Sequence, residues 1–162
     1  MPKRAGALAP PAADPSPPPQ HKPGAAAAAV LVDTGLLVAL FNRQDPHHAQ
    51  AGAWLAACAG PLHTVEAVLV EAAFFLPARL RSSLAELPSR GVLQVHAPDI
   101  AGHARMAQLF LKYRDQDPDW ADLALVWLAE QTGMRRIATL DTTDFSVYRN
   151  HGRTRFQLEL LG

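Results

Sequence analysis

The sequence predicts an α/β fold in which a mostly parallel β-sheet is covered by helices on both faces. Short runs of aliphatic and β-branched residues alternate with longer runs of helical periodicity in the chain after Gly24. Such alternation is typical of a parallel sheet whose strands are joined by crossover helices. The length of 162 residues and the hydrophobic content of 49% suit a single domain with one core.

Five short apolar runs are predicted to form the strands. They lie at residues 29–32, 62–64, 92–96, 136–140 and 156–160. Six helices are predicted between them, at residues 35–41, 47–59, 66–76, 80–87, 99–113 and 118–132. The second and the last of these helices each have an Asp–Pro pair at the start, Asp45 with Pro46 and Asp117 with Pro118. Because Asp caps helix N-termini and Pro fits the first turn, these pairs are predicted to open the two helices.

Residues 1–26 are predicted to be a disordered leader rich in proline and alanine, and residues 27–162 to be the folded domain. Eight of the 14 prolines precede Gly24, and this segment has almost no large apolar side chain to bury. Proline removes backbone hydrogen-bond donors and so disfavours regular elements. Lys3, Arg4 and the alanines that follow Gly24 resemble a secretion signal. The apolar run continues into the first predicted strand, however, which favours a disordered leader over a secretion signal.

The charge balance and the single cysteine exclude several function classes. The 15 basic and 15 acidic residues cancel, so nucleic acid cannot be bound by bulk positive charge and would need local patches or a bound metal. Cys58 is the only cysteine, which excludes an internal disulfide and a Cys-based zinc site and agrees with a reducing, cytoplasmic location. No apolar run reaches the roughly 18 residues of a spanning helix, so no membrane association is predicted.

Four carboxylates interrupt stretches that otherwise belong in a core. Asp33 and Asp141 directly follow predicted strands, whereas Glu71 and Asp122 lie within apolar helices. Burial of an unpaired carboxylate is costly, and the carboxyl ends of parallel strands are where open α/β sheets bind ligands. If the two strands are neighbours, the acids converge and either take up protons or capture a hard cation such as Mg²⁺ or Mn²⁺. Asp119, three residues before Asp122, is a fifth candidate ligand.

Most of these acids also have a purely structural interpretation. A role as a helix cap, as a first-turn acid or in a turn is available to Asp33, Asp119, Asp122, Asp141 and Asp144. The last of these is a weaker, sixth candidate for the site. Glu71 has no such role, because it lies in mid-helix among apolar neighbours. Taken together, the four acids favour the cation site over four independent structural roles.

Three blocks of the sequence resemble the PIN-domain ribonucleases, closest to the VapC-type toxins of prokaryotic toxin–antitoxin pairs. The blocks are VDTGLLVAL, TVEAVLVEAAFFL and DWADLALVWLAEQTGMRRIATLDTTDFSVYR, and the resemblance runs from Val30 to the C-terminus. The last block is the most specific, because it combines in order an acid before a helix, AE, a small loop, IATLD and DF.

The resemblance implies a three-layer α/β/α sandwich around a five-stranded, mostly parallel sheet. It also implies an endoribonuclease that hydrolyses RNA with Mg²⁺ or Mn²⁺, acts as a homodimer and is inhibited by a small antitoxin protein. The family's catalytic and metal-binding quartet falls on the four acids named above, Asp33, Glu71, Asp122 and Asp141. Asp119 matches the acid that often precedes the helical one, and Thr34 and Thr139 match hydroxyl positions near the first and last acids.

Two other function classes remain open at this point. A catalytically inactive PIN-like module that binds RNA or protein would keep the fold without the hydrolysis. A phosphoaspartyl phosphatase also begins with an Asp after a strand, but it uses a second Asp two residues on, where Gly35 stands. The intact quartet favours the nuclease over both.

The aromatic and basic side chains do not identify an RNA path. Trp54, Trp120 and Trp127 lie in apolar helices, where aromatic residues usually pack, so they are predicted to make core or dimer contacts rather than base stacks. The arginines suit a solvated surface, an RNA path or an antitoxin contact equally well.

Overall fold

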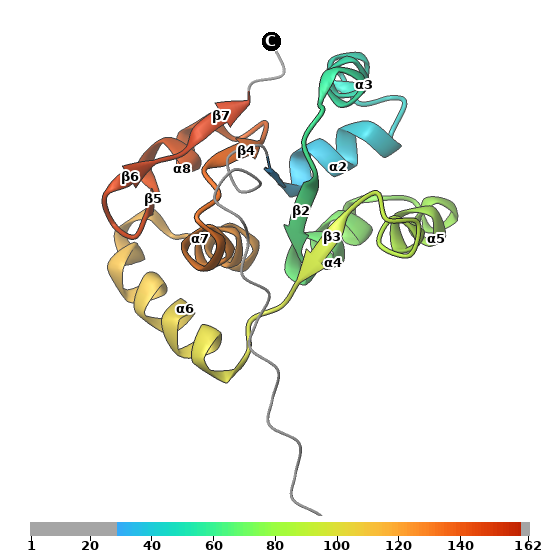
Figure 1. Ribbon diagram of the computed structural model, residues 1–162. Helices are drawn as coiled ribbons and strands as arrows, with labels where there is room; N and C mark the ends of the chain where they lie inside the picture. Colours follow the sequence, from blue (N-terminus) through green and yellow to red (C-terminus); the bar gives the residue numbers. More distant parts are fainter. Residues whose placement is uncertain (1–28, 160–162) are drawn as a thin grey trace, which may run out of the picture.

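A five-stranded parallel sheet forms the centre of the molecule. The computed structural model describes residues 29–159 (Figure 1), so the predicted leader and the predicted start of the domain lie outside the described residues. The strands are β1 (Val30–Val32), β2 (Leu62–Val65), β3 (Gln94–His96), β4 (Arg136–Ala138) and β7 (Gln157–Glu159). Their order is β3-β2-β1-β4-β7, and all four pairings are parallel. The predicted α/β fold with a five-stranded sheet is confirmed.

The helices lie on both sides of this sheet, as the alternation of elements predicts. In Figure 1, α2 (Thr34–Phe41) and α3 (His48–Ala57) lie on one side, and α6 (Ile100–Lys112) and α7 (Trp120–Thr132) lie on the other. The two remaining long helices are α4 (Glu66–Phe75) and α5 (Ala78–Glu86). Within residues 29–159, none of the helices has both the length and the apolar character that crossing a membrane requires.

α7 is the most deeply buried helix of the core. Every residue from position 121 to position 130 is buried, including two acids. Glu130 accepts two hydrogen bonds from the Arg105 guanidinium, at 2.7 and 2.8 Å, which together form a bidentate ion pair. Asp122 is as buried as Glu130, each being 6% exposed, but makes no ion pair within residues 29–159. The ion pair with Arg105 therefore explains how Glu130 can be buried, whereas Asp122 has no counter-charge in the described part of the chain.

Two helices start later than their Asp–Pro pairs predict. α3 begins after His47 and α7 is capped by Asp119, each two residues beyond the predicted cap. Asp45 instead accepts a hydrogen bond from the His47 amide at 2.8 Å, and Asp117 adopts a left-handed conformation with φ of 48°. The Asp–Pro signal was therefore wrong about the helix start, because in both places the pair forms a turn before the helix.

Several short elements have no counterpart in the prediction. They are α8 (Thr142–Val147), a 3-10 helix (Arg114–Gln116), and an antiparallel hairpin of β5 (Arg149–Asn150) and β6 (Thr154–Arg155). The longest of them has six residues, which is too short for a hydrophobic period to become visible in the sequence. The presence of α8 places Asp141 at the start of a helix rather than in a plain turn.

Candidate active site

The carboxyl ends of β1 and β4 bring Asp33 and Asp141 to the same edge of the sheet. The two strands are paired neighbours, and the Asp33 amide donates to the Ala138 carbonyl at 3.2 Å. Thr139 joins the two acids, because its hydroxyl donates to Asp33 Oδ2 at 2.7 Å and accepts from the Asp141 amide at 2.9 Å. Thr139 is only 1% exposed. A buried hydroxyl thus fixes the position of both acids.

One cleft of about 560 Å³ is lined by five of the six acids that the sequence singled out, all but Asp144, and we call it the acidic cleft. Asp33 and Asp141 reach it from the strand ends, Glu71 reaches it from α4, and Asp119 and Asp122 reach it from the start of α7. α4 packs against both α2 and α7, which brings its mid-helix acid to the others. The convergence that the sequence predicts is therefore present in the structure.

Glu71 is held by Thr34, the first residue of α2. The Thr34 hydroxyl donates to Glu71 Oε2 at 2.6 Å, and the Thr34 amide donates to Asp33 Oδ1 at 2.6 Å. Glu71 Oε1 makes no hydrogen bond within the described part of the chain. Both hydroxyl residues that the resemblance indicates, Thr34 and Thr139, thus orient carboxylates of the cleft.

The structural interpretation is confirmed for three of these acids. Asp33, Asp119 and Asp141 are the N-caps of α2, α7 and α8. Asp119 Oδ1 accepts from the Asp122 amide at 2.8 Å, and Asp141 Oδ1 accepts the capping bonds of α8. Capping occupies only Oδ1 of Asp119 and Asp141, so Oδ2 of each stays available to a ligand. The positive N-terminal ends of α2 and α7 also lie beside the cleft and favour negative charge there.

Burial and mutual repulsion raise the pKa values of the deepest acids. Burial is the main cause at Asp33, whose pKa rises from 3.8 to about 6 although two hydrogen bonds oppose the change. Burial, followed by the charges of four neighbouring carboxylates, raises the pKa of Asp122 from 3.8 to about 8. The one side-chain donor to Asp122 within residues 29–159 is the Tyr148 hydroxyl at 3.4 Å. Without a bound cation the cleft therefore disfavours the ionised forms of these two acids.

The donor set of the cleft fits a hard divalent cation. All five side chains offer carboxylate oxygens, the ligands that Mg²⁺ and Mn²⁺ prefer. No three His, Cys, Asp or Glu side chains of the described residues lie close enough to form a ready-made metal cage. Mg²⁺ is commonly held by only one or two carboxylates, with waters and substrate phosphates completing its shell. An open acidic cleft with buried, unpaired carboxylates suits that mode of binding.

Two further acids belong to the surroundings of the cleft. Asp45 lines it from the turn between α2 and α3, whereas the sequence predicts only a helix cap there. Asp144 lies within α8, where burial and the charges of Asp141 and Asp119 raise its pKa. Asp144 was a weak candidate in the sequence. Nothing in the local pattern distinguishes Asp45, because its place in the cleft depends on how the turn folds back.

Comparison with known families agrees with this geometry. The sequence pattern of the PIN domain matches residues 30–150, which include every acid of the cleft. The chain belongs to the PIN-domain family. This PIN domain is 33% identical over 132 residues to ribonuclease VapC26 of Mycobacterium tuberculosis (strain ATCC 25618 / H37Rv), which covers 78% of the chain and 97% of the relative.

The PIN fold is also present in a solved structure of low sequence identity. The crystal structure of VapC20 of Mycobacterium tuberculosis, a toxin that cleaves the sarcin–ricin loop, superposes with a TM-score of 0.62 at 17% identity. The superposition covers 67% of this chain and 86% of the VapC20 chain. Identity at this level supports the shared PIN fold and leaves the chemistry to be argued from the cleft.

Proposed function

We propose that this protein is a metal-dependent endoribonuclease that hydrolyses RNA phosphodiester bonds. The observation that carries the proposal is the acidic cleft, in which Asp33 and Asp122 are buried without a cation from the described part of the chain. A divalent cation would remove the repulsion that raises their pKa values. The relative VapC26 is a ribonuclease, which supports RNA as the substrate.

The proposed ligands of Mg²⁺ or Mn²⁺ are Asp33, Asp122 and Asp141, with Glu71 and Asp119 completing the site directly or through water. When bound, the cation supplies Lewis-acid polarisation of a phosphoryl oxygen and a water of lowered pKa. The two threonine hydroxyls hold the carboxylates in fixed positions, so the ligands need no reorganisation when substrate arrives. The acidic side chains of the cleft alone would repel a phosphate backbone, and cation binding would reverse the sign of that field.

Glu71 is proposed to orient the attacking water. Thr34 occupies Oε2, so Oε1 is the oxygen that can accept a proton from a water in the cleft. In the proposed step, the water oxygen attacks phosphorus in line and releases its proton to the carboxylate. The bond from phosphorus to the leaving ribose oxygen breaks on the opposite side, and that oxygen takes up a proton from solvent.

RNA cleavage is expected only when a divalent cation is present. The purified protein should cut 5′-labelled single-stranded RNA in Mg²⁺ or Mn²⁺, as gel electrophoresis measures, and should stop in excess EDTA. Recovery after Mg²⁺ is added back controls for damage to the protein. Unchanged cleavage in excess EDTA would sink the metal-dependent mechanism, whereas RNA binding without cleavage in every condition would favour the inactive PIN-like binding module.

We further propose that the protein is the toxin of a type II toxin–antitoxin system, acting in the cytoplasm and inhibited by a small antitoxin protein. VapC20, which shares the fold, is a toxin. Induced expression is expected to arrest growth, and coexpression of the cognate small protein to restore it, as colony counts measure. Equal arrest by the Asp33→Asn variant would show that the toxicity does not depend on the acidic cleft.

A stripe of apolar residues on α6 supports the proposal that the protein forms a homodimer. Ile100 and Leu111 are 92% and 70% exposed. With the exposed Ala104 and Ala107 they lie on one face of the helix at the spacing i, i+4, i+7, i+11. Exposed apolar patches on helices are typical of contacts between chains. A parent protein that sediments as a monomer would rule out this contact.

A further inference from the structure

A second cavity adjoins the acidic cleft and has a different character. It has a volume of about 890 Å³ and is lined chiefly by apolar and aromatic side chains, and we call it the aromatic groove. Its main lining residues are Val70, Phe74, Phe75, Pro98, His103 and Trp120. It shares Glu71, Phe75 and Asp119 with the acidic cleft. A molecule bound in the acidic cleft can therefore extend directly into the aromatic groove, because the two cavities share part of their lining.

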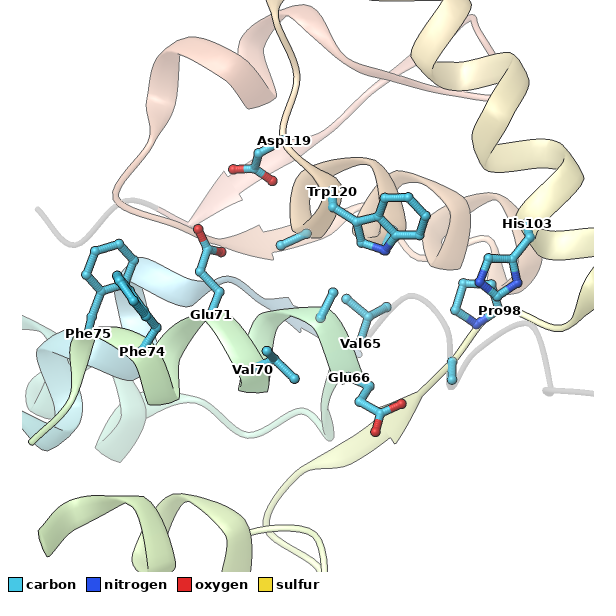
Figure 2. Close-up of a pocket in the computed structure, with 14 residues that line it drawn as sticks. Val65, Glu66, Val70, Glu71, Phe74, Phe75, Pro98, His103, Asp119 and Trp120 are labelled. Atoms are coloured by element: carbon cyan, nitrogen blue, oxygen red, sulfur yellow. The ribbon is translucent and has the colours of Figure 1, made fainter. Parts of the chain in front are cut away.

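The close-up of the groove places its aromatic side chains around the shared acids. Figure 2 shows Glu71 and Asp119 on opposite sides of the groove. Glu71 projects from α4, and Asp119 lies above α4, just before the start of α7. Trp120 and His103 lie to one side of this pair, and Phe75 lies to the other. Aromatic surfaces thus flank the point where the groove meets the cleft.

Trp120 is the aromatic side chain closest in the chain to the acids. It directly follows Asp119, the cap of α7, and it is 53% exposed. Its ring packs against two others, with centroids 5.6 Å from Phe110 and 6.2 Å from His103. Of the two predicted roles for the tryptophans, packing in the core holds for Trp127, which is 7% exposed, whereas Trp120 lies outside the core and keeps the dimer contact as its predicted alternative. A large, fixed ring that is half open to solvent is a ready stacking surface.

The charges of the aromatic groove argue against binding of the RNA phosphate backbone there. Among the described residues no lysine or arginine lines it, while Glu66, Glu71 and Asp119 do. A phosphate would be repelled there unless a cation were present, but a nucleobase is uncharged and has two apolar faces. Base stacking on aromatic side chains needs no particular sequence, because every base has such faces. The groove therefore suits the base next to a phosphate that lies in the acidic cleft.

We propose that the aromatic groove is a base subsite, in which an unpaired RNA base beside the scissile phosphate stacks on Trp120. The proposal rests on the proposed ribonuclease function and adds to it the surface that receives the base beside the scissile phosphate. It also assigns Trp120 a positioning role, since the stacked base fixes the phosphate against the carboxylates.

A double-substitution cycle tests the contact between Trp120 and one base. The binding measurements use the catalytically silenced Asp141→Asn protein in Mg²⁺ and a short single-stranded RNA, either intact or with one abasic nucleotide beside the cleavage position. Trp120→Ala is expected to weaken binding of the intact RNA by about 5-fold or more, and Trp120→Phe by less. The abasic nucleotide should weaken binding by a similar factor with Trp120 present and by little with Trp120→Ala.

The controls separate the subsite from general effects. Val147→Ala truncates another partly exposed apolar side chain, outside both cavities, and should leave binding unchanged. Additive losses in the cycle, or equal losses from an abasic nucleotide at every position, would overturn the subsite. A Trp120→Ala protein that sediments as a monomer beside a dimeric parent would assign the groove to a second copy of the chain instead. If the parent cleaves no RNA at all, the ribonuclease function fails, which is a different result from an additive cycle in an active enzyme.

Discussion

Asp141→Asn is expected to lower the rate of RNA cleavage in Mg²⁺ by at least about 100-fold while the domain stays folded. Loss of a group that merely hydrogen-bonds to a metal ligand already costs roughly 10- to 100-fold in affinity or activity, and this change removes the charge of a proposed ligand itself. The fold should survive, because an Asn oxygen can accept the same bonds from the Thr143 and Asp144 amides, now 3.0 Å each. Initial rates on labelled RNA and the melting temperature measure the two effects.

Asp99 provides the matched control for this substitution. It caps α6, where its Oδ1 accepts from the Gly102 amide at 2.7 Å, and it does not line the acidic cleft. Asp99→Asn therefore makes the same chemical change at a helix cap and should alter the rate by no more than about twofold. Equal losses in both variants would trace the effect to helix capping. Full activity in Asp141→Asn would remove Asp141 from the proposed site.

The sheet and its long helices could be predicted because their hydrophobic patterns are long. The buried strand β1 and the buried helix α7 are near-continuous apolar runs, which leave few alternatives to a core position. The start of α7 was predicted two residues early, at Asp117 instead of Asp119. Asp–Pro reports a local turn preference, and only packing decides whether the helix begins at that turn or beyond it.

The acids of the cleft could be predicted because each is out of place in its own segment. Glu71 was the clearest case, since a mid-helix acid among apolar residues has no local role. Asp45 was missed for the opposite reason, because an acid before a proline in a polar turn is ordinary. Trp120 was assigned to the core or to a dimer contact because an apolar helix normally buries its aromatic side chains. Its exposure depends on how α7 packs against α4 and α6, which a single sequence does not encode locally.

Helix capping and the proposed cation binding are compatible roles for the same residues. Asp119 and Asp141 each cap a helix through Oδ1 and face the acidic cleft. A cap fixes the carboxylate relative to a rigid helix, so the other oxygen is held in a defined direction. The structural and functional interpretations of these acids therefore support each other, and a substitution that keeps the cap isolates the loss of charge.

Asp122→Asn is expected to make the cation-free domain more stable at pH 8.5 and to weaken the stabilisation of the domain by Mg²⁺. In the folded parent the pKa of Asp122 is about 8 and that of Asp33 about 6, each against 3.8 for an unburied carboxyl. Between about pH 4 and pH 8 the folded protein therefore holds protons that the unfolded chain has released. The part of the free energy of unfolding that comes from these two protonated acids is thus fully present below about pH 4. It is lost as the pH rises toward 8.

The substitution removes the Asp122 part of this dependence, because Asn stays neutral at every pH and keeps its backbone bond to Asp119 Oδ1. Melting in EDTA should show the variant above the parent by roughly 5 °C or more at pH 8.5 and by little at pH 4.5. The difference between parent and variant cancels the titration of groups elsewhere. Saturating Mg²⁺ should raise the melting temperature of the parent at pH 8.5, since a cation binds only the folded cleft, and should raise that of the variant far less. A variant that is less stable than the parent at pH 8.5 in EDTA would show that the buried charge of Asp122 is already compensated inside the protein, and the argument for a cation in the cleft would lose its main support.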